Sequence, residues 1–243
     1  MMKLTVFGNN ASCPEADGAC SSFLVEAAGK RILLDMGCAS LPQIQRRYDL
    51  AELDLIVISH LHFDHCGDLF CAKYQLETRI ARGQALAPLA LCSPALPEWA
   101  AKELLQGEVF RHTTVFDGSQ YQLEGVELTF FQVPHLVESY AVRVCAEGKI
   151  LTYSGDSGPC EILACAAKGA DCFLCEASLV EGQHAESNHH LMAGEAGRVA
   201  KDAHVGRLLL THYHSEDAQQ VLIQAQRCFP NASLSCIGES YEI

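Results

Sequence analysis

The stretch Ser59-His-Leu-His-Phe-Asp-His-Cys-Gly-Asp68 is the most informative part of this sequence, because it holds three of the chain's eleven histidines within six residues. Imidazole nitrogens and carboxylate oxygens are the ligands that zinc and similar divalent metals prefer. Closely spaced neutral histidines have no packing rationale of their own. The H-x-H-x-D-H pattern of His60, His62, Asp64 and His65 therefore predicts a metal site, and we favour this over a solvated polar loop.

A short apolar run comes directly before this pattern. Residues 54–59, Asp-Leu-Ile-Val-Ile-Ser, are rich in β-branched side chains and predict a buried strand that ends where the histidines begin. In an extended chain, residues two apart point the same way, so His60 and His62 can bind one metal. The turn through Asp64 and His65 directs these two side chains elsewhere. Two adjacent metals are therefore expected.

Length and composition predict a soluble, cytoplasmic chain with one domain over residues 1–243. The chain is 49% hydrophobic, has no 18-residue apolar run and shows no charged-then-apolar leader, so no membrane partner is expected. Its formal net charge is −13, from 17 basic and 30 acidic residues. No segment is rich in Lys or Arg, which argues against the large phosphate footprint of nucleic-acid-binding proteins.

Thirteen cysteines are scattered along the chain, and their odd number and apolar settings favour reduced thiols over a disulfide framework. Cys172 and Cys175 have C-x-x-C spacing but lie in a predicted buried strand. Residues three apart in a strand point to opposite faces, so core packing is favoured over metal binding or redox chemistry. Cys66 follows the histidine pattern directly, and a ligand or redox role for it is left open.

The remaining periodicity predicts strands and helices throughout the chain, in an arrangement typical of an α/β sandwich. Strands are expected over 3–7, 22–26, 31–34, 128–133, 141–144, 150–153, 172–176 and 207–211, with a further apolar stretch over 90–92. Helices are expected over 41–47, 69–80, 98–105, 161–167, 193–203 and 216–226.

Three further candidate ligands lie at the ends of predicted strands. His135 follows Val133-Pro134, Asp156 lies within Ser154-Gly-Asp-Ser-Gly158, and His212 ends the run Leu208-Leu-Leu-Thr-His. Alone, each could be a structural histidine or a turn aspartate. Together with the pattern at 60–65, they favour one shared metal site.

With these motifs the chain resembles the metallo-β-lactamase-fold hydrolases, and within them the ribonuclease Z-like phosphodiesterase branch. Leu33-Leu-Asp-Met-Gly37 resembles the first motif of that family, residues 60–65 the second, and His135, Asp156 and His212 the third to fifth, in family order. The resemblance spans nearly the whole chain. It implies a four-layer αββα sandwich, with two mixed β-sheets and helices on both outer faces.

The resemblance also implies a ligand set for two divalent metal ions, zinc by default, with manganese or iron as alternatives. The first metal would be bound by His60, His62 and His135, the second by Asp64, His65 and His212, and Asp156 would bridge the two. Asp35 would support these ligands from behind.

Residues after the bridging aspartate resemble the ribonuclease Z-like branch in particular. Glu176-Ala-Ser178 is similar to its H-E-A-T motif, with Cys175 in place of the histidine, and His190 is similar to the histidine of its H-S-T motif, followed here by Leu191 and Met192. By resemblance, His190 stabilises the transition state or donates a proton, and Glu176 orients it. Asp64 would help to orient a metal-bridging hydroxide, the expected nucleophile.

The resemblance implies a zinc-dependent phosphodiesterase, and the spacing of its motifs bears on the size of the substrate. Only twenty residues separate His135 from Asp156, so the tRNA-binding arm that the family inserts there is absent. A small phosphodiester, such as a cyclic nucleotide or a short oligonucleotide, is therefore expected. The alternatives are a tRNA 3′-processing endoribonuclease, a lactonase or thioesterase of the same superfamily, and a non-catalytic metal-binding regulatory protein. By resemblance, a homodimer is possible.

Overall fold

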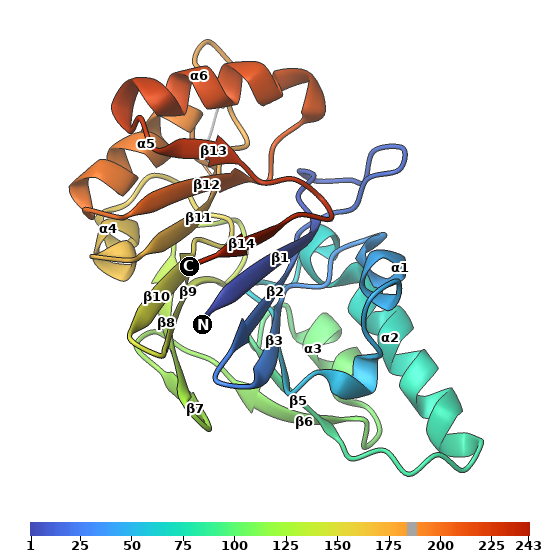
Figure 1. The fold of residues 1–243 in the computed structure, drawn as a ribbon. Coiled ribbons are helices and arrows are strands. Elements are labelled where there is room, and N and C mark those ends of the chain that lie inside the picture. Colours follow the sequence, from blue (N-terminus) through green and yellow to red (C-terminus); the bar gives the residue numbers. More distant parts are fainter. Residues whose placement is uncertain (184–188) are drawn as a thin grey trace.

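The computed structural model describes residues 1–183 and 189–243, which form two seven-stranded β-sheets packed face to face (Figure 1). In spatial order, the first sheet contains β14 (Ser240–Glu242), β1 (Lys3–Gly8), β2 (Ser22–Ala27), β3 (Lys30–Leu34), β4 (Leu55–Val57), β5 (Leu89–Ser93) and β6 (Phe110–Thr114). The second contains β13 (Ala232–Leu234), β12 (Arg207–Thr211), β11 (Cys172–Glu176), β10 (Lys149–Tyr153), β9 (Ser139–Ala146), β8 (Val126–Val133) and β7 (Gln120–Leu123).

Both sheets are mixed, and the same pattern occurs in each half of the chain. In the first sheet, the pairings from β14 to β3 are antiparallel and those from β3 to β6 are parallel. In the second, the pairings from β7 to β10 are antiparallel and those from β10 to β13 are parallel. Parallel strands bring their carboxyl ends to one edge of a sheet, and the predicted ligands follow such ends.

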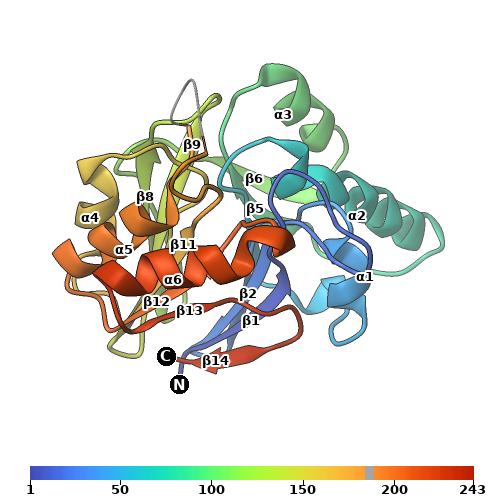
Figure 2. The same ribbon diagram turned by 90° about the horizontal axis from the view of Figure 1, so that it is seen from above.

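Helices cover the outer face of each sheet, which gives the expected four-layer αββα sandwich (Figures 1 and 2). The first sheet carries α1 (Ser40–Gln45), α2 (Phe63–Ala81) and α3 (Glu98–Leu105), and the second carries α4 (Glu161–Ala167), α5 (Ala193–Asp202) and α6 (Ala218–Cys228). Two short 3₁₀ helices, η1 (Leu50–Glu52) and η2 (Ser215–Asp217), complete the described elements.

The strands build three apolar layers because successive side chains point to opposite faces. Phe23 and Val25 of β2 lie in the core between the two sheets, whereas Leu24 packs against the helices of the first sheet. In β11, Cys172 lies between the sheets and Cys175 faces the helices of the second sheet, so the prediction of opposite faces is confirmed. Full burial of each large apolar side chain contributes about 1.5–3 kcal/mol to stability.

The structure differs from the expected elements in two respects. Helix α2 begins at Phe63, six residues before the expected start, so Asp64 and His65 lie in its first turn and His62 is its extended N-cap residue. The four edge strands, β6, β7, β13 and β14, were not expected. Strands β6, β7 and β14 are exposed over much of their length and lack a clear apolar alternation, and β13 has only three residues. Among the described residues, no helix is long and apolar enough to span a bilayer.

Candidate metal centre

The predicted site residues meet at one edge of the two sheets, although they are spread over much of the sequence. In the first sheet, His60 follows β4, and the N-terminal turn of α2 supplies Asp64 and His65. In the second sheet, three ligand candidates follow the ends of β8, β10 and β12, and Glu176 is the last residue of β11. Open α/β sheets bind ligands at such carboxyl ends of strands.

Four groups of described side chains have ligand atoms close enough to hold a metal ion, and two of these groups consist only of predicted metal ligands. The other two contain His190, with His135 and Asp156 or with Glu176 and His212. Of the two groups of predicted ligands, the first is His60, His62 and His135, and the second is Asp64, His65, Asp156 and His212; within each group the ligand atoms lie within 4.8 Å of one another. In the first group, His62 Nδ1 lies 3.1 Å from His60 Nε2 and 3.2 Å from His135 Nε2. Three imidazole nitrogens therefore converge on one point.

The carboxylate of Asp156 lies between the two groups. Its Oδ2 is 3.7 Å from His60 Nε2 and 4.0 Å from His135 Nε2, and it is also 3.4 Å from His212 Nε2. Its Oδ1 is 3.2 Å from His65 Nε2. Within the described part of the chain, Asp156 is thus the only carboxylate of the two groups that lies within 4.0 Å of histidine nitrogens of both.

Protein partners fix the ring nitrogens that face away from the centre. His135 Nδ1 donates to the backbone carbonyl of His189 at 2.9 Å, and His212 Nδ1 lies 2.8 Å from Ser178 Oγ. His60 Nδ1 lies 3.1 Å from Ser59 Oγ. Such contacts select the tautomer whose other nitrogen offers a lone pair to the centre. Sequence reasoning assigned no role to Ser59, Ser178 or His189, because these residues carry no ligand signature.

Asp35, the aspartate of the first motif, lies in a fully buried network beside the ligand groups. Its carboxylate lies 2.7 Å from His65 Nδ1 and accepts hydrogen bonds from Ser59 N at 2.7 Å, Ser59 Oγ at 2.8 Å and the Tyr153 hydroxyl at 2.7 Å. Asp35 and His212 also have positive φ, 59° and 52°. Non-glycine residues held in this left-handed region cost free energy and cluster at functional sites.

The first group of histidines is held in the neutral form that binds metals. Burial lowers the pKa of His60 well below its ordinary value, and it also lowers the pKa of His62 and of His135. Neutral imidazoles bind a cation without first losing a proton.

In the second group, neighbouring charges affect the pKa values of Asp156 and His65 more than burial does. Burial opposes ionisation of Asp156, but His212 and His65 hold its pKa well below the ordinary value. Burial likewise opposes protonation of His65, but the carboxylates of Asp156, Asp64 and Asp35 raise its pKa well above the ordinary value.

Two buried atoms test whether a metal fits this site. His65 Nε2 and Asp156 Oδ1 are both buried and have no hydrogen-bond partner among the described residues, although they face each other. Burying unpaired polar atoms is costly, and each such atom requires an explanation. Both are atoms that a divalent cation would bind, so the donor set fits a metal.

A second cluster lies directly beside the ligands. His190 Nδ1 donates to Glu176 Oε1 at 3.0 Å and lies 3.8 Å from Asp156 Oδ2, while its ring stacks on that of His212 with centroids 5.5 Å apart. Burial opposes protonation of His190, but the hydrogen bond to Glu176 raises its pKa to about 9. Ser178 Oγ donates to Glu176 Oε2 at 2.7 Å. The structure thus brings both predicted residues, His190 and Glu176, next to the ligand groups.

Cys66 lies apart from the ligand groups. It is fully buried in the apolar layer between α2 and the first sheet, and burial strongly raises its thiol pKa. It belongs to none of the ligand clusters among the described residues, so packing accounts for it.

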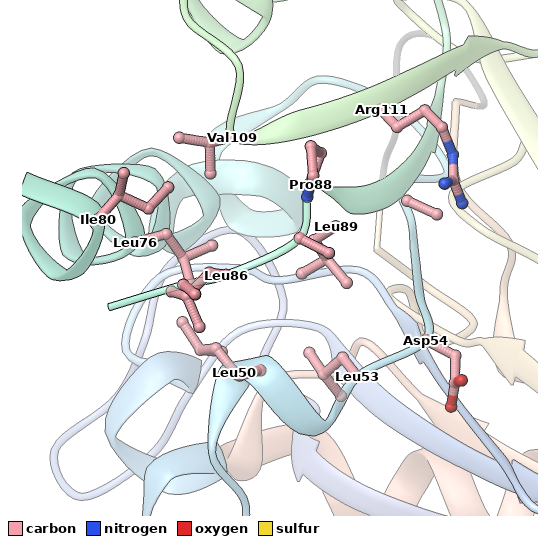
Figure 3. Close-up of a pocket in the computed structure, with 14 residues that line it drawn as sticks. Leu50, Leu53, Asp54, Leu76, Ile80, Leu86, Pro88, Leu89, Val109 and Arg111 are labelled. Atoms are coloured by element: carbon pink, nitrogen blue, oxygen red, sulfur yellow. The ribbon is translucent and has the colours of Figure 1, made fainter. Parts of the chain in front are cut away.

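A cavity of about 350 Å³ lies elsewhere on the molecule (Figure 3). It is formed by residues at the amino ends of β4 and β5 and in the C-terminal half of α2, and Leu50, Leu76 and Leu89 are among its apolar side chains. Its charged lining residues are Asp54 and Arg111. Its described lining contains no histidine or cysteine and a single carboxylate, that of Asp54, so it offers no cluster of metal-binding side chains.

Comparison with known proteins agrees with this geometry. A family profile described as a beta-lactamase superfamily domain matches residues 16–213. The chain belongs to the metallo-β-lactamase superfamily. Within this superfamily it is a metallo-hydrolase with ribonuclease Z-like relatives.

Relatives in this superfamily cover nearly the whole chain. An uncharacterised protein of Mycobacterium leprae is 33% identical over 100% of this chain and 89% of its own length. The probable metallo-hydrolase YhfI of Bacillus subtilis is 28% identical over 87% of this chain and 86% of its own, and a crystal structure of YhfI matches with a TM-score of 0.92, 24% identity and 100% coverage of both chains. Ribonuclease Z of Archaeoglobus fulgidus is 26% identical over 97% of this chain and 95% of its own length.

The arm of the ribonuclease Z-like branch is absent, as the sequence predicted. Between His135 and Asp156 the metallo-hydrolase forms only β9 and β10, which are joined by the tight turn at Glu147 and Gly148. The chain therefore fits that branch of the superfamily without its arm.

Proposed function

We propose that this metallo-hydrolase is a phosphodiesterase that binds two divalent metal ions, zinc by default, and cleaves a small phosphodiester. The observation that carries the proposal is the position of Asp156 between two ligand groups, with the Glu176–His190 pair beside them. One ion would be held by His60, His62 and His135, and the other by Asp64, His65 and His212. Asp156 would bind both ions. Two-metal sites are suited to in-line displacement at phosphorus.

The protein groups around the ligands can act on such a substrate. When bound, the two cations would lower the pKa of a water to around 7 and offset the charge of a phosphodiester. Asp64 Oδ2 lies 3.1 Å from His212 Nε2, and its other oxygen can orient the attacking water. His190, which Glu176 keeps protonated, can donate a proton to the leaving oxygen as the bond to phosphorus breaks.

The limited size of the substrate rests on shape and charge. The short β9–β10 hairpin leaves no arm to hold a tRNA body, and a net charge of −13 supplies no basic surface in its place. A cyclic nucleotide or a short oligonucleotide needs only the centre itself and its immediate surroundings. Efficient 3′ maturation of a tRNA precursor would overturn this preference in favour of a ribonuclease Z activity.

The test is turnover of bis-p-nitrophenyl phosphate by protein of measured metal content, comparing the wild type with Asp156→Ala and with the surface variant Asp202→Ala. We expect metal-dependent turnover in the wild type and in Asp202→Ala. Loss of residues that merely orient ligands costs about 10- to 100-fold, so Asp156→Ala should lose more than about 100-fold. Its metal content should also fall.

The same protein preparation separates the rival functions. Turnover of a lactone or a thioester, with none of the phosphodiester, would place this chain among the carbonyl-ester hydrolases of the superfamily. Two bound metals without turnover of any of the three substrates would point to a non-catalytic, metal-binding regulatory protein.

A further inference from the structure

Two exposed aromatic side chains lie beside the metal centre without a role in the chemistry proposed above. Phe63 directly follows His62 at the start of α2 and is 57% exposed, and Trp99 in α3 is 56% exposed. Their ring centroids are 5.7 Å apart and their planes are inclined by 50°. The pair therefore forms a continuous aromatic surface that begins one residue from a predicted metal ligand.

Core packing does not account for this surface. The buried side of α3 consists of Ala100, Ala101 and Leu104, which pack in the apolar layer shared with α2. On a helix with 3.6 residues per turn, Trp99 lies on the side away from these three residues. Large apolar side chains that gather on a surface mark binding sites more often than isolated ones do.

The surrounding structure holds α3, and with it Trp99, in a fixed position beside α2. Lys73 Nζ of α2 donates to the carbonyl of Glu103 in α3 at 2.7 Å. Glu138, three residues after His135, accepts from Leu96 N at 3.1 Å. The linker before α3 is thus tied to the segment that follows a predicted ligand, and α3 stands beside the first part of α2 in Figure 2.

We propose that Phe63 and Trp99 form a stacking platform for a nucleobase, so that the substrate of this enzyme is a nucleoside phosphodiester. The proposal rests on the phosphodiesterase function, since the metal centre would hold the phosphate while the base lies on the adjacent rings. Aromatic side chains stack on any base because every base has a π face. The platform therefore selects nucleotides over other phosphodiesters without selecting one base by hydrogen bonds.

The chain provides its own probe, because Trp99 is its only tryptophan. We would titrate the metal-loaded protein with adenosine 5′-monophosphate and with ribose 5-phosphate, which has the same phosphate and sugar but no base. The nucleotide should quench the tryptophan fluorescence with saturation. Ribose 5-phosphate should leave the fluorescence unchanged. Its affinity, measured by competition with the nucleotide, should be lower by about tenfold or more, because stacking on one aromatic residue contributes a factor of this size or larger.

Two substitutions on the same helix separate stacking from general effects. Phe63→Leu keeps an apolar side chain but removes the ring, and it should weaken nucleotide binding about tenfold while leaving the affinity for ribose 5-phosphate unchanged. Tyr74→Leu removes another exposed aromatic ring of α2, about 16 Å further along the helix axis, and should change neither affinity. Calorimetry with Trp99→Ala, which has no tryptophan signal, should show the same weakening as Phe63→Leu.

Two results would overturn the platform. One is equal affinity for adenosine 5′-monophosphate and ribose 5-phosphate. The other is quenching of the tryptophan fluorescence by a hexanoyl ester but not by the nucleotide. Turnover of bis-p-nitrophenyl phosphate tests the phosphodiesterase function separately. Turnover without preference for the nucleotide would reject the platform alone. Preferential nucleotide binding without turnover of any phosphodiester would reject the catalytic function but retain the nucleobase site.

Discussion

Most histidines of the candidate metal centre are oriented by a contact of the ring nitrogen that faces away from the ligand groups. For His65 the partner in this contact is Asp35, for His212 it is Ser178, and for His190 it is Glu176. These partners differ in charge, and the charge of the partner affects whether the ring is protonated. A serine hydroxyl orients His212, whereas a buried carboxylate raises the pKa of His190 and keeps it protonated at neutral pH.

The contact between Glu176 and His190 predicts how kcat depends on pH. Because Glu176 raises the pKa of His190 to about 9, the proton that His190 donates is present at neutral pH and is lost as the pH rises through that value. In Glu176→Gln the charge is gone, and burial then lowers the pKa of His190. We expect the alkaline limb of the kcat profile to move to lower pH in this variant, with unchanged metal content.

His190→Ala is the reference for this experiment. With a cyclic nucleotide, whose leaving alkoxide must be protonated, it should lose the alkaline limb and lower kcat by about 100-fold or more, the usual contribution of general acid catalysis. If His190→Ala retains the turnover and the pH profile of the wild type, then His190 has no catalytic role, and the proton comes from another group.

At the level of elements, the centre depends on how closely the loop after β3 approaches the first turn of α2. Gly37 lies in this loop, and a Cβ atom placed there would come within 1.9 Å of the carbonyl oxygen of Asp64. Met36 N donates to the carbonyl of His65 at 2.8 Å, so the two segments are also joined by a backbone hydrogen bond. The first turn of α2, which carries two predicted ligands, is therefore positioned by a glycine.

Gly37→Ala should displace the first turn of α2 and weaken metal binding. A methyl group cannot be accommodated against a backbone carbonyl, so we expect a loss of stability of about 1–3 kcal/mol from overpacking, together with a reduced metal content. Chemical denaturation and metal analysis measure the two effects. Gly29→Ala, where an added Cβ atom meets open space, serves as the control and should lose stability only through its positive φ.

At the scale of the whole molecule, the metal centre joins the two halves of the sandwich. The first half supplies His60, His62, Asp64 and His65, and the second half supplies His135, Asp156 and His212. Each of the two ligand groups contains residues from both halves. A metal bound by the proposed ligands would therefore stabilise the packing of the two sheets as well as its own site.

Removal of the metal should lower the unfolding temperature. A ligand present at 100 times its Kd stabilises the folded state by about 2.7 kcal/mol, which corresponds to about 5–10 °C for a chain of this size. Calorimetry with zinc and with a chelator measures the difference. An equal shift in Asp156→Ala would mean that the stabilising metal binds elsewhere on the chain.

Much of the fold was predictable because its central strands carry a strong apolar signal. The buried strands β2, β3, β11 and β12 were all expected near their observed bounds. The edge strands were not, because β6 and β7 are exposed along much of their length and β13 has only three residues, so none of them carries that signal. The early start of α2 was also missed, since ligand residues occupy its first turn in place of an apolar repeat.

The sequence by itself determined the types of ligand, their order and their places after strands, because those features depend on local spacing and on the chemistry of imidazole and carboxylate groups. Only the tertiary structure decided which serines and carbonyls orient the histidines, and that Phe63 and Trp99 lie side by side. Contacts between residues such as Asp64 and His212 depend on how two sheets pack. Such packing is a property of the whole folded chain, and local sequence patterns do not encode it residue by residue.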